Sequence, residues 1–234
     1  MHKDQVRERI LEIGIVPVVR ASSPREALLT VEAVCAGGIP IVEITMTVVG
    51  ALEVIRQVVR DRGTRTLVGA GTVLDAAAAQ QCLDAGAEFL VSPGLDLETV
   101  ALARQEKKLM MAGALTPTEI MAAVKAGTDF VKIFPCANLG GPKYIAALKG
   151  PFPNVPMIPT GGVNLATAEE FLGAGATALG VGGELVQKEA LRQGKPEIIA
   201  ETARRFREAV ARGRAATTAD APKSATLKKE KAEA

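Results

Sequence analysis

Short apolar runs separated by amphipathic stretches repeat along most of the chain. The runs have the length and β-branched content of buried strands, and they lie near residues 15–19, 39–45, 66–71, 89–92, 109–113, 129–134, 156–160 and 178–182. Helical periodicity is found near residues 3–13, 24–35, 50–60, 75–85, 96–106, 117–126, 142–148, 165–173 and 196–211. Phrases such as CAGGIPIVEI and KAGTDFVKI pass from a helix end through glycine into a strand. The pattern predicts strands and helices in strict alternation.

Such alternation is typical of a parallel α/β protein. Eight strand–helix units in about 200 residues favour a closed (β/α)8 TIM barrel, preceded by an N-terminal helix, over an open doubly wound sheet. No Gly-x-Gly-x-x-Gly follows the first strand, which argues against dinucleotide binding. We therefore expect a single barrel domain over residues 1–212.

The chain changes character at Gly213. Residues 213–234 contain one large aliphatic residue, Leu227, in a background of alanine, threonine, lysine and glutamate. Such a segment cannot bury enough apolar surface to offset the entropy of ordering it. We predict a flexible C-terminal tail over residues 213–234.

Composition excludes several classes of function. The formal net charge is +2, with one tyrosine and no tryptophan, which leaves little for nucleic-acid binding. No apolar run reaches the ~18 residues of a membrane span, and the charged start does not resemble a secretory signal. Three cysteines without paired spacing suit a reducing compartment. We expect a cytoplasmic protein with neither nucleic-acid nor membrane partners.

The only histidine, His2, lies at the start of the chain. A histidine-ligated metal site or a Ser-His-Asp triad therefore cannot be built within one chain. Acid–base chemistry is left to carboxylates, lysine, tyrosine, hydroxyl groups and water.

Two predicted strands carry a charge at an apolar position. In DFVKIFP, alternation places Lys132 on one face with Phe130 and Phe134, and in IPIVEIT it places Glu43 on a face with Ile41 and Thr45. Taken alone, Lys132 is either a lysine that reaches water at a strand end or a desolvated nucleophile of lowered pKa. If both side chains point into one barrel lumen, the presence of a charge in each apolar strand is explained. The two residues would then form either a structural salt bridge or a nucleophile with its acid/base.

Glycine pairs follow the last two strands, in PTGGV and GVGGE. Loops in these positions of an α/β barrel commonly bind phosphate through backbone amides. Gly161 and Gly162 precede an expected helix start at Val163 and Asn164. The two pairs indicate a phosphate site, although glycine can also end a strand for steric reasons.

Longer phrases carry a family resemblance. They are PVVR, VEITMT, GAGTVLDA, FLVSPGLD, TPTEIM, DFVKIFPCANLGGPKYIAALKGPFPNVPMIPTGGV and GVGGELV. In their order and spacing, from about Gly14 to Val186, the chain resembles the 2-dehydro-3-deoxy-phosphogluconate (KDPG) aldolases, a family that includes the 4-hydroxy-2-oxoglutarate (KHG) aldolases.

The resemblance implies a class I aldolase, usually a homotrimer, that needs no metal or other cofactor. Its substrate would be a 2-keto-3-deoxy sugar acid, cleaved to pyruvate and either glyceraldehyde 3-phosphate or glyoxylate. By the resemblance, Lys132 forms the Schiff base and Glu43 is the general acid/base. The implied substrate-binding residues are Arg20, Thr47, Thr72, Pro93, Phe134 and Thr160. The implied phosphate-binding residues are Gly161, Gly162, Gly182 and Gly183.

Two positions depart from the family pattern. Thr47 stands where many members have an arginine that binds the substrate carboxylate, and Arg20 is the nearest candidate to replace that charge. Glu184 stands where members often have a serine that donates to phosphate, and a carboxylate facing a phosphate would repel it. A sugar-phosphate isomerase or epimerase and a non-catalytic trimeric scaffold are the alternative functions.

Overall fold

The structure, a computed structural model, describes residues 1–219. Its eight parallel strands are β1 Ile15–Val19, β2 Ile41–Thr45, β3 Leu67–Gly71, β4 Phe89–Val91, β5 Leu109–Ala114, β6 Phe130–Ile133, β7 Met157–Pro159 and β8 Leu179–Val181. They pair in the order β7-β6-β5-β4-β3-β2-β1-β8. A bridge between Thr160 and Gly180 joins the two outer strands, and the Thr177 amide donates to the Met157 carbonyl at 2.9 Å. The predicted (β/α)8 barrel is confirmed.

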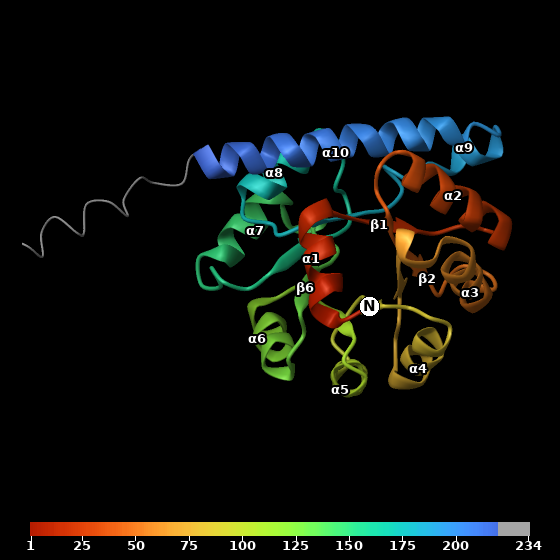
Figure 1. The fold of residues 1–234 in the computed structure, drawn as a ribbon. Helices are drawn as coiled ribbons and strands as arrows, with labels where there is room; N and C mark the ends of the chain where they lie inside the picture. The colour runs from red at the N-terminus through yellow and green to blue at the C-terminus, as the bar shows by residue number, and fades with distance from the viewer. Residues whose placement is uncertain (220–234) are drawn as a thin grey trace, which may run out of the picture.

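Helices surround the barrel (Figure 1). They are α1 Lys3–Ile13, α2 Pro24–Ala36, α3 Ala51–Arg62, α4 Ala76–Asp84, α5 Leu97–Gln105, α6 Pro117–Ala126, α7 Pro142–Lys149, α8 Ala168–Gly173, α9 Lys188–Arg192 and α10 Pro196–Ala219. Short 3₁₀ turns occur at Gly63–Arg65 and Ala137–Leu139. Side-chain caps explain several starts: Ser23, Asp75, Asp96 and Thr116 each accept a hydrogen bond from the backbone three residues on. The short α9 was not predicted from the sequence.

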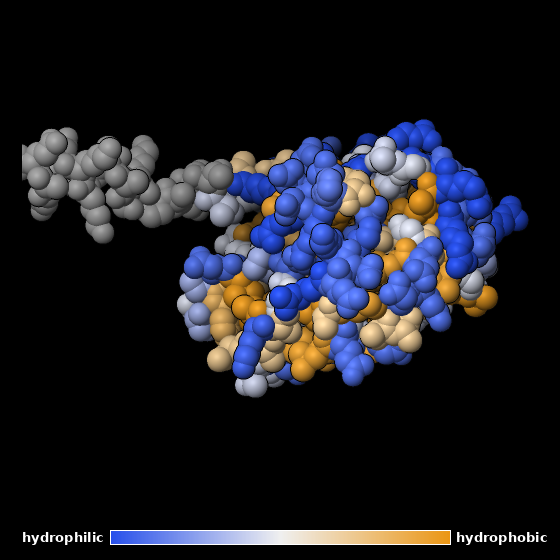
Figure 2. Space-filling model, turned by 60° about the horizontal axis from the view of Figure 1, so that its bottom comes forward, coloured by the Kyte–Doolittle hydropathy of each residue, from blue (hydrophilic) through white to orange (hydrophobic). Residues whose placement is uncertain are grey.

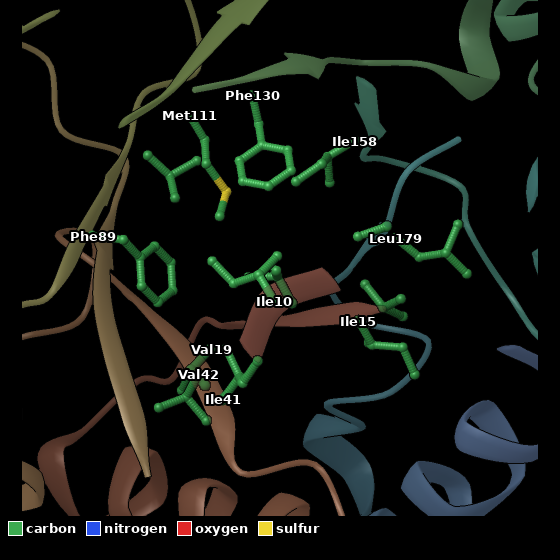
Figure 3. Packing of buried hydrophobic residues seen from close by; sticks show 14 of the residues in the cluster. Ile10, Ile15, Val19, Ile41, Val42, Phe89, Met111, Phe130, Ile158 and Leu179 are labelled. Atoms are coloured by element: carbon green, nitrogen blue, oxygen red, sulfur yellow. The ribbon is translucent and has the colours of Figure 1, made fainter. Parts of the chain in front are cut away.

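Helix α1 closes the N-terminal end of the barrel. Its Ile10 is fully buried, and Figure 3 shows Phe89, Met111, Phe130 and Ile158 arranged around it. These side chains fill the lower lumen as a packed core. The polar side chains of the lumen therefore lie toward the opposite end, where the strands finish.

Helix α10 is longer than predicted. It runs to Ala219 and lies along α8 and α2 (Figure 1). Gly213 is buried against Leu172, and the Arg214 side chain donates to the backbone carbonyls of Leu11 and Glu12. The predicted tail start at Gly213 is therefore wrong for residues 213–219, because alanine-rich sequence forms helix well and gains packing here. The remainder of the predicted tail lies outside the described residues.

The face of the protein that Figure 2 shows is mixed in polarity. In the face that Figure 2 shows, apolar residues are scattered between hydrophilic ones. Within residues 1–219, no helix combines the length and apolar character needed to span a membrane.

Candidate active site

Lys132 and Glu43 meet inside the barrel. Their strands, β6 and β2, are separated by three strands in either direction around the sheet, so only side chains that point into the lumen can approach each other. The distance from Lys132 Nζ to Glu43 Oε1 is 3.5 Å, with the two side chains 5% and 3% exposed. The structure thus brings together the two charges that strand parity placed on inward faces.

Glycines on β3 make the space that Glu43 occupies. Gly69 and Gly71 are the register partners of Glu43 and Thr45 on β2. A Cβ on Gly71 would lie 1.9 Å from Glu43 Oε1, and a Cβ on Gly69 would lie 2.2 Å from the Phe89 ring. Larger residues at these two positions would displace the carboxylate or the ring beneath it.

The contact between Lys132 and Glu43 is longer than an ideal charge-assisted hydrogen bond, which spans about 2.7–2.9 Å. Glu43 Oε1 is buried and has no hydrogen-bond partner among residues 1–219. The ammonium also lies 5.5 Å from the centroid of the Phe134 ring, within cation–π range. A buried, unsatisfied carboxylate oxygen beside an amine is a ready acceptor for a hydroxyl group of a bound molecule.

Phe134 and Pro93 line one hollow of about 490 Å³ at the ends of β4, β5 and β6. Gly113, the register partner of Lys132, also lines it, and a Cβ there would come 2.2 Å from the Pro93 backbone. The buried Ser92 hydroxyl donates to the Gly94 carbonyl at 2.6 Å, which holds this turn in shape. The apolar wall of the site is thereby fixed beside the lysine.

Threonine hydroxyls lie at the ends of β2 and β3. Thr45 Oγ1 donates to the Val19 carbonyl at 3.0 Å and lies 2.7 Å from Thr47 Oγ1. The single hydroxyl hydrogen of Thr45 is used in the bond to Val19, so Thr47 must donate its own hydrogen to Thr45. The Thr47 hydroxyl can therefore only accept a hydrogen bond from a ligand. Thr72 follows Gly71 with φ +55°, a conformation that threonine rarely adopts and that is often found at functional sites.

The two predicted glycine loops differ in shape. Gly161 and Gly162 have φ +87° and +77°, and a Cβ on Gly162 would lie 2.2 Å from Ala137 Cβ. The buried Thr160 before them donates its amide to the Ile133 carbonyl at 2.9 Å. Gly182 and Gly183 have no positive φ and no atom within 4 Å of a built Cβ. Only the first loop requires glycine for backbone and packing reasons.

The helix expected at Val163 and Asn164 begins later, at Ala168. The Asn164 side chain accepts hydrogen bonds from the amides of Ala166 and Thr167, at 2.9 and 3.0 Å. Asparagine thereby stabilises a turn in place of the first helical turn, because its side chain competes for backbone donors.

Arg20 lies at the β1–β8 corner of the site. It lines a hollow with Val18, Gly183, Val186 and Lys188. Thr47 does not line that hollow. The predicted substrate-binding residues therefore lie at the same end of the barrel but do not all line one hollow. Pro93 and Phe134 share one hollow, whereas Arg20 lines another beside the second glycine pair. Glu184, the residue after that pair, is exposed.

Burial changes the acidity of two groups near the lysine strand. It raises the pKa of the Cys136 thiol to about 11, so this cysteine is a protonated core residue near neutral pH. Burial also raises the pKa of Tyr144, with smaller contributions from Cys136 and Glu119, and the Tyr144 hydroxyl donates to the Leu115 carbonyl. Among residues 1–219, no three histidine, cysteine, aspartate or glutamate side chains are grouped to hold a metal ion.

Sequence reasoning missed three contributors to the site. Gly71 makes room for Glu43, Ser92 shapes the Pro93 turn, and Lys188 lines the hollow with Arg20. The signal for Gly71 was present, because GAG places glycine at two successive inward positions of a strand. No local signal marks Lys188, which belongs to a helix that the sequence did not predict.

Comparison with known proteins gives consistent matches. A family model described as "KDPG and KHG aldolase" matches residues 6–202. The KHG/KDPG aldolase of Escherichia coli K12 is 34% identical over 199 residues, which cover 84% of this chain and 92% of that protein. The 2-dehydro-3-deoxy-phosphogluconate aldolase of Pseudomonas aeruginosa is 35% identical over 161 residues, 69% of this chain and 73% of that protein.

A solved structure of a similar protein carries a bound intermediate. It is the KDPG aldolase of Legionella pneumophila with pyruvate captured as a covalent carbinolamine. The two folds superpose with a TM-score of 0.79 at 29% identity, over 86% of this chain and 97% of the other.

Proposed function

Because this chain belongs to the KDPG and KHG aldolase family and is therefore a carbon–carbon lyase, we propose that Lys132 carries its reaction as a Schiff-base nucleophile. The observation that carries the proposal is the buried contact of 3.5 Å between Lys132 Nζ and Glu43 Oε1. A nucleophilic amine needs a neighbouring group that accepts and returns protons, and Glu43 is placed to do so.

The proposed reaction is a reversible retro-aldol cleavage. The neutral Lys132 amine attacks the C2 ketone of a 2-keto-4-hydroxy acid, and loss of water gives an imine. The protonated imine withdraws the electron pair of the C3–C4 bond while Glu43 accepts the proton of the C4 hydroxyl, and the aldehyde leaves. Protonation of the enamine at C3 and hydrolysis of the imine release pyruvate and return the free lysine.

We propose roles for the surrounding residues, supported by their positions and by the family resemblance. We assign the wall beside the reacting carbons to Phe134 and Pro93, which share a hollow with the register partner of Lys132. Thr72 and Thr160 are assigned to polar groups of the substrate. Thr47 is assigned to a substrate hydroxyl group, which can donate a hydrogen bond to the Thr47 oxygen. We assign the loop of Gly161 and Gly162 to the phosphate end, together with Gly182 and Gly183.

The proposed substrate is KDPG, KHG or both, as the names of the curated relatives suggest. Pyruvate release from KDPG, its C4 epimer, the unphosphorylated sugar acid and KHG, measured side by side, would rank them. Equal rates with all four would contradict a site selective for the distal group and for the C4 configuration.

Borohydride trapping tests the central step. Incubation with pyruvate and borohydride should add one reduced pyruvate unit to Lys132, detected by peptide mass spectrometry. Lys132→Met supplies the control, since it should gain no adduct. If wild-type Lys132 stays unmodified under conditions that trap other imine-forming aldolases, the Schiff-base proposal fails.

Glu43→Gln tests the acid/base assignment. General acid/base groups contribute about 10²–10⁴-fold, so turnover should fall by that factor while some pyruvate is still trapped on Lys132. Full turnover in this variant would remove Glu43 from the proposed role.

We also propose that the protein is a cytoplasmic homotrimer. Family membership supports the assembly, and the free cysteines Cys35, Cys82 and Cys136 suit a reducing compartment. Sedimentation equilibrium should give three times the chain mass, and a monomer at micromolar concentration would contradict the proposed assembly.

A further inference from the structure

The β1–β8 corner contains a hollow of about 410 Å³, which we call the corner hollow, lined by Val18, Arg20, Gly183, Val186 and Lys188. Val18 is the register partner of Glu43. Register partners in a parallel sheet point to the same face, so Val18 faces the lumen as Glu43 does. Val18 therefore belongs both to the lumen wall, on the face that Glu43 shares, and to the lining of the corner hollow.

Two exposed cations, Arg20 and Lys188, line the corner hollow, and neither forms an ion pair with another described residue. Within residues 1–219, no carboxylate lies within 4.0 Å of a side-chain nitrogen of Arg20 or Lys188, and neither side chain donates a hydrogen bond. By contrast, Arg9 and Arg62 donate to oxygen atoms of neighbouring segments. Two unpaired positive charges around one hollow create a potential that favours an anion.

Two acidic residues of neighbouring segments, Glu26 and Glu184, do not take that place. Glu26 accepts hydrogen bonds from the Ser22 hydroxyl and from the Ser22 amide, the latter at 3.0 Å. These bonds lower the pKa of Glu26, with smaller effects from the charges of Arg192 and Lys188. Glu26 is therefore an anion that Ser22 already holds. Glu184 is exposed and does not line the corner hollow.

We propose that Lys188, together with Arg20, binds the anionic group at the far end of the substrate, a phosphate or a carboxylate. This assigns Arg20 to the far end, whereas the family resemblance suggested it for the carboxylate beside the ketone. The proposal rests on the Schiff-base function, because Lys132 fixes the keto end of the substrate beside Glu43. The far end then extends along the lumen wall past Val18 to the rim. Lys188 thus supplies a positive charge near the loop where Glu184 replaces the serine expected from the family resemblance.

Substitution of Lys188 tests the assignment. Lys188→Gln should lower kcat/KM for KDPG about tenfold, mainly through KM, because the variant loses the charge-assisted hydrogen bond to the distal anion. The loss should be several-fold smaller with the unphosphorylated sugar acid, which has the same carbon chain without the distal charge. The effect of Lys188→Gln on kcat/KM should also be measured with KHG, which ends in a carboxylate. Comparison with KDPG then shows whether Lys188 binds the phosphate, the carboxylate or both.

Arg192→Gln is the matched control. Arg192 lies on the same short helix, carries the same charge and does not line the corner hollow. Its removal should change kcat/KM by no more than about twofold. Inorganic phosphate, used as a competitive inhibitor, should bind Lys188→Gln more weakly than either the wild type or Arg192→Gln.

Pyruvate trapping separates this proposal from the one on which it rests. Pyruvate has no distal group, so borohydride should label Lys132 equally in the wild type and in Lys188→Gln. Equal losses with charged and uncharged substrates, or equal effects of Lys188→Gln and Arg192→Gln, would overturn the role of Lys188 while trapping persists. Loss of trapping in the wild type would overturn the Schiff-base function itself.

Discussion

The backbone of Gly71 lies against the carboxylate of Glu43. A Cβ on Gly71 would stand 1.9 Å from Glu43 Oε1, well inside the closest approach of two atoms. Glu43 comes from β2 and Gly71 from β3, so the missing side chain of one strand sets the position of the catalytic candidate on its neighbour. This contact explains the glycine at position 71, and the Phe89 ring explains the one at position 69.

Gly71→Ala should impair activity more than stability. The added methyl group forces the Glu43 carboxylate away from Lys132, and a displacement of about 1 Å at a reacting group can cost about 100-fold in rate. We expect kcat to fall by at least that factor in the pyruvate-release assay, with a folded barrel by circular dichroism. Gly173→Ala is the control, because nothing lies within 4 Å of a Cβ there. Unchanged kcat in Gly71→Ala would show that Glu43 tolerates displacement.

The protein should be no more stable with the buried Lys132–Glu43 pair than with two apolar residues in its place. Removing one member of a buried ion pair typically destabilises by about 3–5 kcal/mol, whereas replacing both by apolar residues is often neutral or stabilising. Lys132→Met alone should therefore lower the free energy of unfolding by that amount, and Lys132→Met with Glu43→Leu should restore it without activity. Urea unfolding measures both. A double variant less stable than the single one would indicate that the pair is retained for the fold.

Arg214 should contribute to stability through α1. Its guanidinium donates to the carbonyls of Leu11 and Glu12 at the C-terminal end of that helix, where carbonyls lack helical partners and a cation is favourable. Arg214→Met should lower the free energy of unfolding by about 1–3 kcal/mol. The exposed Arg205 on the same helix offers the control Arg205→Met, for which we expect little change. Similar urea midpoints for both variants would contradict this role.

Acid should weaken the start of α6. Backbone hydrogen bonds from Thr116 and Leu115 lower the pKa of Glu119, which caps that helix. The stabilisation is therefore present above the unfolded pKa of about 4.3 and is lost as pH falls through the lower folded pKa. Between about pH 5 and pH 3, the stability of the wild type should fall more steeply than that of Glu119→Gln. Glu98→Gln, on the exposed first turn of α5, should keep the wild-type slope.

The sequence by itself determined the architecture and the two central residues. Alternating apolar runs encode burial locally, because a side chain's face in a strand depends only on its parity. Eight such runs with helices between them leave few arrangements other than a barrel. Parity also placed Lys132 and Glu43 on inward faces, and this made them the candidates for the reaction that we propose.

Only the tertiary structure decided how segments remote in sequence meet. It placed β2 opposite β6 so that Lys132 and Glu43 approach to 3.5 Å, and it set Lys188 beside Arg20 at the β1–β8 corner. It also continued α10 past Gly213, since the gain from packing on α8 and α1 is absent from local composition. Local periodicity fixes which face each residue shows, whereas distances between faces arise from closure of the barrel and from contacts that no single segment contains.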